Sequence, residues 1–175
     1  MQDNLQNNFT LKNLTSILIG GLILAFSYFL KTTLDAILLD DSVNNVIFGF
    51  IITLIVLSTL ILFVDGKKTA NKNKTTLWNT KTKLATKKYL ICFAFILSIL
   101  ALLLNLEYLA YLTPTFLILY GVLLFLFKNN KRKNLLVLSG LCLLLATMCF
   151  LIPSYWYSSI SIIGIAHIAY GVVTR

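Results

Sequence analysis

Residues 109–152 read LAYLTPTFLILYGVLLFLF, then KNNKRKN, then LLVLSGLCLLLATMCFLI. Two apolar blocks without Asp, Glu, Lys or Arg thus flank a short basic segment. A hydrocarbon core of ~30 Å requires about 20 apolar residues in helical form, with ~17 as the practical minimum. Each block is long enough to cross a bilayer, so the stretch predicts a transmembrane hairpin.

The same pattern extends through the rest of the chain. Each apolar block is free of charged residues, and one charge at the bilayer centre costs at least ~2.5 kcal/mol. We therefore predict an all-α polytopic membrane helical bundle, a single transmembrane domain over residues 1–175. The six predicted transmembrane helices are residues 14–30, 46–64, 89–106, 109–127, 135–152 and 156–173.

Composition excludes an ordinary soluble domain, which is about half apolar and a quarter charged. Here 58% of residues are hydrophobic and 12% are charged. The net charge of +9 would favour nucleic acid in a soluble protein, but the basic residues lie between the apolar blocks. Membrane topology and anionic lipid headgroups account for them there. We expect the lipid bilayer as partner, with anionic headgroups at the lysines, and no nucleic acid.

The basic residues also predict orientation. If the six blocks cross alternately, every Lys and Arg except Lys31 falls on one side of the membrane. The positive-inside rule makes that side the cytoplasm and places both termini there. Residues 67–88 carry eight of these lysines without a continuous apolar stripe. They predict a solvated, lipid-facing linker, with a partner-docking site as the alternative. Residues 33–41 fit either a short interfacial helix or an extension of the first span.

Patterns for catalysis, cofactors or metals do not occur in the sequence. It contains no HExxH, G-x-S-x-G or Walker motif and no paired carboxylates. The three cysteines, Cys92, Cys142 and Cys149, lie in apolar blocks and form no CxxC pattern. We expect them to be buried and to pack as small hydrophobic residues. We therefore expect that the protein is not an enzyme and that it has no catalytic residues, no cofactor and no metal site.

His167 is the only histidine and lies well inside the last predicted span. Two interpretations stay open: an intramembrane proton or ligand site, because imidazole titrates near neutrality, or a hydrogen-bonded clasp between helices. Ser161, Gly164, His167 and Gly171 share one helix face and form the candidate packing or polar site. The candidate small-residue counterparts are Gly20, Gly21 and Ala25 on the first span and Ser139, Gly140 and Ala146 on the fifth.

Two short matches suggest internal repetition. Lys12-Asn13-Leu14 matches Lys133-Asn134-Leu135, and Tyr120-Gly121-Val122 matches Tyr170-Gly171-Val172. The matched helices would cross the membrane in the same direction, so the matches favour three repeated two-helix hairpins over two inverted halves.

The last hairpin runs through Arg132-Lys-Asn-Leu, Gly140, Ala146, Pro153, Gly164 and Gly171. The hairpin thus begins with basic residues, continues with small residues, turns at a proline and ends with two glycines. This order resembles the HdeD-type family of small six-span bacterial membrane proteins. The resemblance implies a role in bacterial stress or acid tolerance without a catalytic motif, and a place in the bacterial cytoplasmic (inner) membrane.

We therefore expect a noncatalytic envelope or stress-related membrane protein that works by packing against lipids or partners. The partner would be another membrane protein or a second copy of the chain in a homo-oligomer. The alternative is a small transporter or channel for a neutral or apolar solute. Ion-coupled transport normally requires buried carboxylates or broken helices, whereas hydroxyls and carbonyls suffice to line a pore for a neutral solute.

Overall fold

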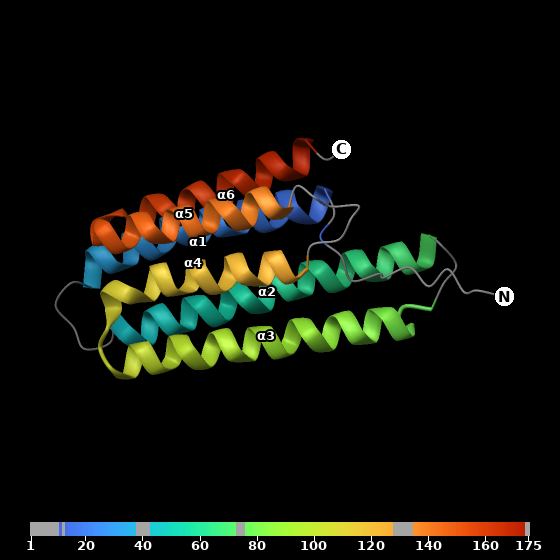
Figure 1. Ribbon diagram of the computed structural model, residues 1–175, viewed down its shortest axis with the longest axis horizontal. Coiled ribbons are helices and arrows are strands. Elements are labelled where there is room, and N and C mark those ends of the chain that lie inside the picture. Colours follow the sequence, from blue (N-terminus) through green and yellow to red (C-terminus); the bar gives the residue numbers. More distant parts are fainter. Residues whose placement is uncertain (1–10, 12, 38–42, 73–75, 128–134, 174–175) are drawn as a thin grey trace.

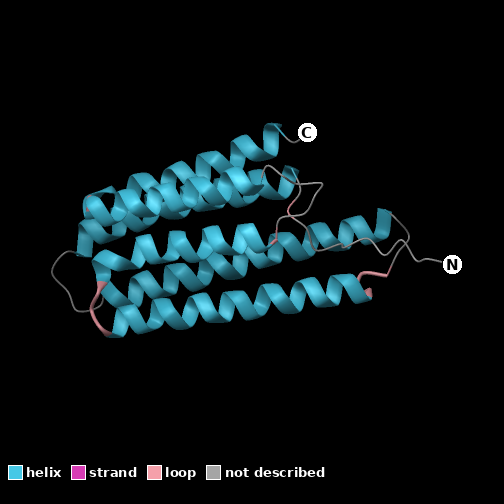
Figure 2. Ribbon diagram, in the orientation of Figure 1, coloured by secondary structure: helices cyan, strands magenta, loops and turns pink. Residues whose placement is uncertain are grey.

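The computed structural model describes residues 11, 13–37, 43–72, 76–127 and 135–173, and nearly all of these residues are helical (Figures 1 and 2). The described ranges contain no strand, so the all-α prediction is confirmed. The turn Pro153–Tyr155 is a short 3-10 helix that joins the last two α-helices. The α-helices are α1 (Asn13–Ile37), α2 (Val43–Lys72), α3 (Thr80–Asn105), α4 (Leu109–Leu126), α5 (Leu135–Leu151) and α6 (Trp156–Val173).

The helices run side by side along the long axis of the molecule (Figure 1). The most extensive contacts join α1 to α6 and α4 to α5, while consecutive helices within each hairpin also touch. Helices α2 and α3 contact each other only sparingly. The first and last helices of the chain are therefore direct neighbours, and this contact holds the C-terminal hairpin against the N-terminal helix.

Five of the described helices are long and apolar enough to cross a membrane, and α5 is a shorter apolar helix of 17 residues. At 1.5 Å per residue, 18 residues extend ~27 Å, close to the thickness of the hydrocarbon core. The chain is thus a multi-pass membrane protein.

Apolar side chains cover the outside of the bundle as well as its core. Leu100, Leu117 and Cys142 are fully buried, whereas Phe95 is 61% and Val137 73% exposed. A soluble protein rarely exposes large contiguous apolar surface, because water penalises it. Lipid carries no such penalty, so the outer faces of the helices are suited to contact with acyl chains.

The lysine-rich segment is the main difference from the predicted organisation. Residues 67–88 were expected to form a linker, but α2 continues to Lys72 and α3 already begins at Thr80. The Asn79 side chain caps α3 by accepting a 2.8 Å hydrogen bond from the Thr82 backbone N–H. The linker is therefore shorter than predicted, because adding turns to an existing helix costs little and lysine is a good helix former. Residues 73–75 lie outside the described ranges.

The first helix also extends beyond its predicted end. Of the two alternatives for residues 33–41, the extension of the first span is correct as far as Ile37. Residues 38–41 lie outside the described part of the chain.

Glycines permit the close approach of α1 and α6. A Cβ atom added at Gly20 would lie 2.5 Å from the Gly164 carbonyl oxygen, and one at Gly171 would lie 2.5 Å from the Asn13 carbonyl oxygen. Gly21 and Gly140 by contrast have open space where a Cβ would lie. Apolar burial gives helices in lipid little reason to associate, so such backbone contacts have to come from small residues.

The adjacent glycines of α1 provide a matched test of this crossing. Gly20→Ala should destabilise the protein by about 1–3 kcal/mol, because the methyl group forces the α6 backbone away. Gly21→Ala should leave stability unchanged or raise it by up to about 1 kcal/mol, because alanine is the better helix former. Thermal unfolding in detergent, followed by circular dichroism, measures both effects. Equal behaviour of the two variants would contradict the crossing geometry.

Candidate functional site

The His167 side chain lies at the junction of three helices. It belongs to α6, is completely buried, and contacts polar groups of α1 and α4. Its Nδ1 atom is 3.2 Å from the Ser16 Oγ on α1, and its Nε2 atom is 2.7 Å from the Tyr120 hydroxyl on α4. Ser16 also donates a 2.8 Å hydrogen bond to the His167 carbonyl oxygen. We call Ser16, Tyr120 and His167 the histidine cluster.

The hydrogen bonds around His167 fit a tautomer with its hydrogen on Nδ1. The carbonyl oxygen can only accept, so the single Ser16 hydroxyl hydrogen is used there. The contact between Ser16 Oγ and Nδ1 then requires Nδ1–H as donor. A neutral imidazole with its hydrogen on Nδ1 leaves Nε2 as an acceptor, and the Tyr120 hydroxyl donates to it. Each hydrogen is used once, so the histidine cluster fits a neutral imidazole.

The cluster does not have the geometry of an activated nucleophile. In nucleophilic catalysis the base accepts the hydroxyl proton, and a third group orients the base. Here the Ser16 hydroxyl donates to the His167 carbonyl oxygen, so in the tautomer with hydrogen on Nδ1 the imidazole does not act as a base toward Ser16. No group of three His, Cys, Asp or Glu side chains suited to a metal ion occurs in the described ranges.

The other predicted site residues lie along the same contact with α1. Gly164 and Gly171 are buried against Gly20, Leu24, Asn13 and Ile17 of α1. The Ser161 hydroxyl is 3.2 Å from the Ser27 hydroxyl of α1. The structure thus brings all four predicted residues to one interface.

The proposed partners of this face were only partly correct. Gly20 lies at the crossing, but Gly21 and Ala25 of α1 are exposed. On α5, the Ser139 hydroxyl donates a 2.7 Å hydrogen bond to the Gly121 carbonyl oxygen of α4, and Gly140 is exposed. Ser139 therefore serves the α4–α5 contact, and Ala146 of α5 is fully buried.

Sequence reasoning missed two residues of this interface, Ser16 and Ser27. Both lie on the buried face of α1 together with Gly20, at spacings of four and seven residues. That pattern of small and polar residues was visible in the first span. The pattern does not by itself identify an interhelical contact, because serine and threonine hydroxyls in membrane helices usually bond their own helix, as Thr53, Ser98 and Thr147 do here.

Further buried polar groups lie outside the histidine cluster. The Cys149 thiol on α5 donates a 3.1 Å hydrogen bond to the Ser159 hydroxyl on α6, so this cysteine is more than a small hydrophobe. The Thr15 hydroxyl is buried beside Ser16 in the sequence and has no hydrogen-bond partner within the described residues. Polar contacts between helices thus accompany both of the tightest helix pairs and the α5–α6 pair.

Comparisons of this chain with protein-family models, with curated proteins and with solved structures gave no match.

Tyr120→Phe tests the contribution of the histidine cluster to stability. The variant removes the donor to His167 Nε2 and keeps the ring, so we expect a loss of about 1 kcal/mol, within the range of interhelical hydrogen bonds in membranes. Tyr111→Phe is the matched control, because Tyr111 lies on the same helix and is exposed. Thermal unfolding in detergent should separate the two variants. Unchanged stability of Tyr120→Phe would show that the bond contributes nothing.

Proposed function

We propose that this chain is a noncatalytic protein of the cytoplasmic membrane that supports envelope stress tolerance by contact with lipids or membrane partners. The observation that supports a noncatalytic role is that both His167 ring nitrogens meet hydroxyls from other helices, those of Ser16 and Tyr120, and that no carboxylate among the described residues orients the imidazole. A lone histidine that meets only hydroxyls, with no carboxylate or second histidine in any of the six predicted spans, is more often a hydrogen-bonded clasp between helices than a proton or ligand site. The clasp interpretation of His167 is therefore favoured over the proton-site interpretation.

We further propose six membrane crossings with both termini in the cytoplasm. The 17 residues of α5 reach the practical minimum for a span, ~17 residues. With α5 counted, the basic residues alternate with the spans, and only Lys31 falls outside. The Lys31 Nζ lies 4.7 Å from the centre of the Tyr157 ring, a cation–π contact that would hold this lysine in the outer interface.

The hairpin repeat and the family resemblance are part of the same proposal. Gly121 of α4 packs on α5, and Gly171 of α6 packs on the start of α1. Each Tyr-Gly-Val glycine thus meets a helix whose start belongs to the Lys-Asn-Leu match, which supports a repeat of the second and third hairpins, whereas the equivalent α2–α3 contact is sparse. The stress role rests on the HdeD-type resemblance of the last hairpin.

Single cysteines at the two ends of the bundle test the topology. Thr76→Cys lies in the α2–α3 connection and Ser154→Cys in the α5–α6 turn, and both wild-type residues are exposed. In intact cells a membrane-impermeant maleimide should label Ser154→Cys and leave Thr76→Cys unlabelled until the cells are opened. The unmodified protein supplies the background from the native cysteines, of which Cys142 and Cys149 are buried and Cys92 is partly buried. Labelling of Thr76→Cys in intact cells would contradict the proposed orientation.

A deletion strain tests the physiological role. It should survive acid or envelope-damaging challenge less well than the wild type. The His167→Ala variant should restore survival at temperatures where it stays folded, because the imidazole carries no chemistry in this proposal. Failure of well-folded His167→Ala to restore survival would contradict the clasp interpretation. A defect confined to uptake of a neutral solute would instead support the transport alternative.

A further inference from the structure

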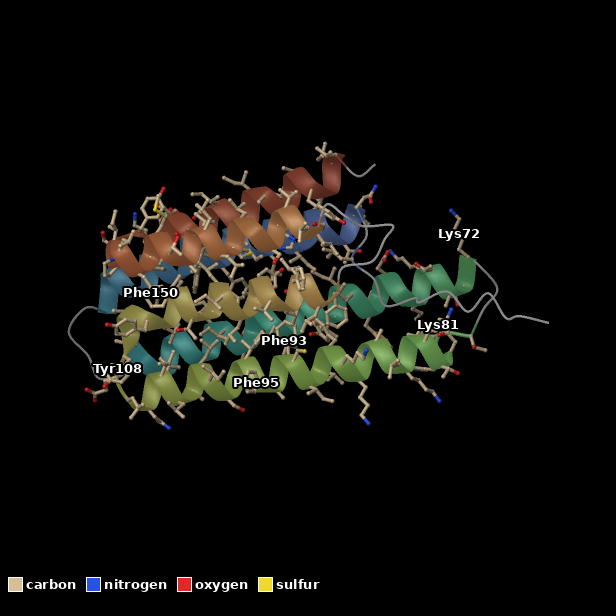
Figure 3. All side chains as sticks on the ribbon, in the orientation of Figure 1. Lys72, Lys81, Phe93, Phe95, Tyr108 and Phe150 are labelled. Atoms are coloured by element: carbon tan, nitrogen blue, oxygen red, sulfur yellow. The ribbon has the colours of Figure 1, made fainter. Side chains whose placement is uncertain are left out.

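The basic ends of α2 and α3 extend beyond the membrane core. Helix α2 has 30 residues and α3 has 26, which at 1.5 Å per residue gives ~45 Å and ~39 Å, against ~30 Å of hydrocarbon. Lys72 and Lys81 lie at the same end of the bundle, opposite Tyr108 and Phe150 (Figure 3). The exposed lysines of this end are Lys67, Lys68, Lys72, Lys81, Lys83, Lys87 and Lys88.

On α3 the lysines continue a lipid-facing apolar stripe. Lys81, Leu84, Lys88, Ile91 and Phe95 follow one another at alternating spacings of three and four residues, and therefore share one helix face. All five are exposed, and the three apolar members are more than half exposed. The face that carries ammonium groups at one end of α3 is thus the face that meets acyl chains farther along.

Helix α2 has the same arrangement. Leu60, Val64, Lys68 and Lys72 occur at every fourth position and are all exposed. Charge therefore replaces apolar side chains along one face of α2 as well, over the turns that leave the hydrocarbon. We call the α3 residues and these four α2 residues the lysine stripes.

An aromatic pair lies near the change from apolar to charged residues. Trp78, in the α2–α3 connection, is 48% exposed, and its ring centre is 6.0 Å from that of Phe63 on α2. Tryptophan prefers the depth of the lipid headgroups. Asp65 is the only carboxylate described at this end, and it has interactions of its own. The described charge here is thus strongly positive.

We propose that the lysine stripes, together with Trp78, form a surface that binds anionic phospholipid. The acyl chains would lie along Ile91 and Phe95, and the lysine stems would reach past them to place their ammonium groups on the phosphate. Charge complementarity and the shared face together select a lipid over a soluble anion, because only a lipid fills both parts of the stripe. This inference rests on the proposed membrane topology and names the lipid class that the lysine-rich side recognises.

Quenching of Trp78 by brominated lipid tests the site. Trp156→Phe leaves Trp78 as the only tryptophan. The full chain is reconstituted into phosphatidylcholine vesicles in which an equal minor fraction is either brominated phosphatidylglycerol or brominated phosphatidylcholine. One lysine near an anionic surface contributes about 1 kcal/mol. One such contact therefore raises the affinity for phosphatidylglycerol over phosphatidylcholine by roughly five-fold. We therefore expect phosphatidylglycerol to be preferred by at least roughly five-fold.

Matched variants make the result specific. The preference should fall to near one in the Lys68→Gln, Lys72→Gln, Lys81→Gln, Lys88→Gln variant, whose melting temperature should not change because all four lysines are exposed. It should persist in Lys31→Gln, at the opposite end. With Trp78→Phe, the remaining Trp156 near the other end should show no preference.

Equal quenching by the two brominated lipids, or a preference that survives the fourfold lysine variant, would overturn the proposal. The vesicles have the same lipids in both leaflets, so this result does not depend on orientation. Equal quenching together with the expected cysteine labelling would remove the lipid site alone. Reversed cysteine labelling together with the expected preference for phosphatidylglycerol would contradict the proposed topology and leave the lipid site standing.

Discussion

The close crossing of α1 and α6 is the contact on which the rest of the structure depends. Gly20 and Gly171 let the two backbones meet where any side chain would collide with a carbonyl oxygen. That approach brings Ser16 within hydrogen-bonding distance of His167 and closes the bundle between the first and last helices. In lipid this closeness has to replace the hydrophobic drive that holds soluble bundles together.

The histidine cluster adds a polar connection to that packing. A buried imidazole without partners would be costly in a medium that cannot hydrogen-bond. Tyr120 from α4 and Ser16 from α1 satisfy both ring nitrogens, so the same bonds that remove this cost also join three helices. The arrangement explains how a lone histidine is accommodated in an apolar span, and it favours a structural role over proton transfer.

The sequence predicted the helical class and the approximate position of each helix, because an apolar block free of charge has few alternatives in lipid. It did not predict that α2 and α3 continue through the lysines, because the absence of an apolar stripe says little about a helix already nucleated in the membrane. Gly164, His167 and Gly171 were recognisable from their spacing. Their partners Ser16 and Tyr120 were not, because one sequence does not reveal which spans are neighbours.

A disulfide between the first and last helices tests the central contact most directly. The hydroxyls of Ser27 and Ser161 lie 3.2 Å apart across the α1–α6 interface. With the three native cysteines replaced by serine, Ser27→Cys with Ser161→Cys should form an intramolecular disulfide on mild oxidation in the membrane, seen as a mobility shift that reductant reverses. Ser27→Cys with Ser154→Cys should not. Failure of the first pair to cross-link in well-folded protein would contradict the α1–α6 contact and the placement of His167 that depends on it.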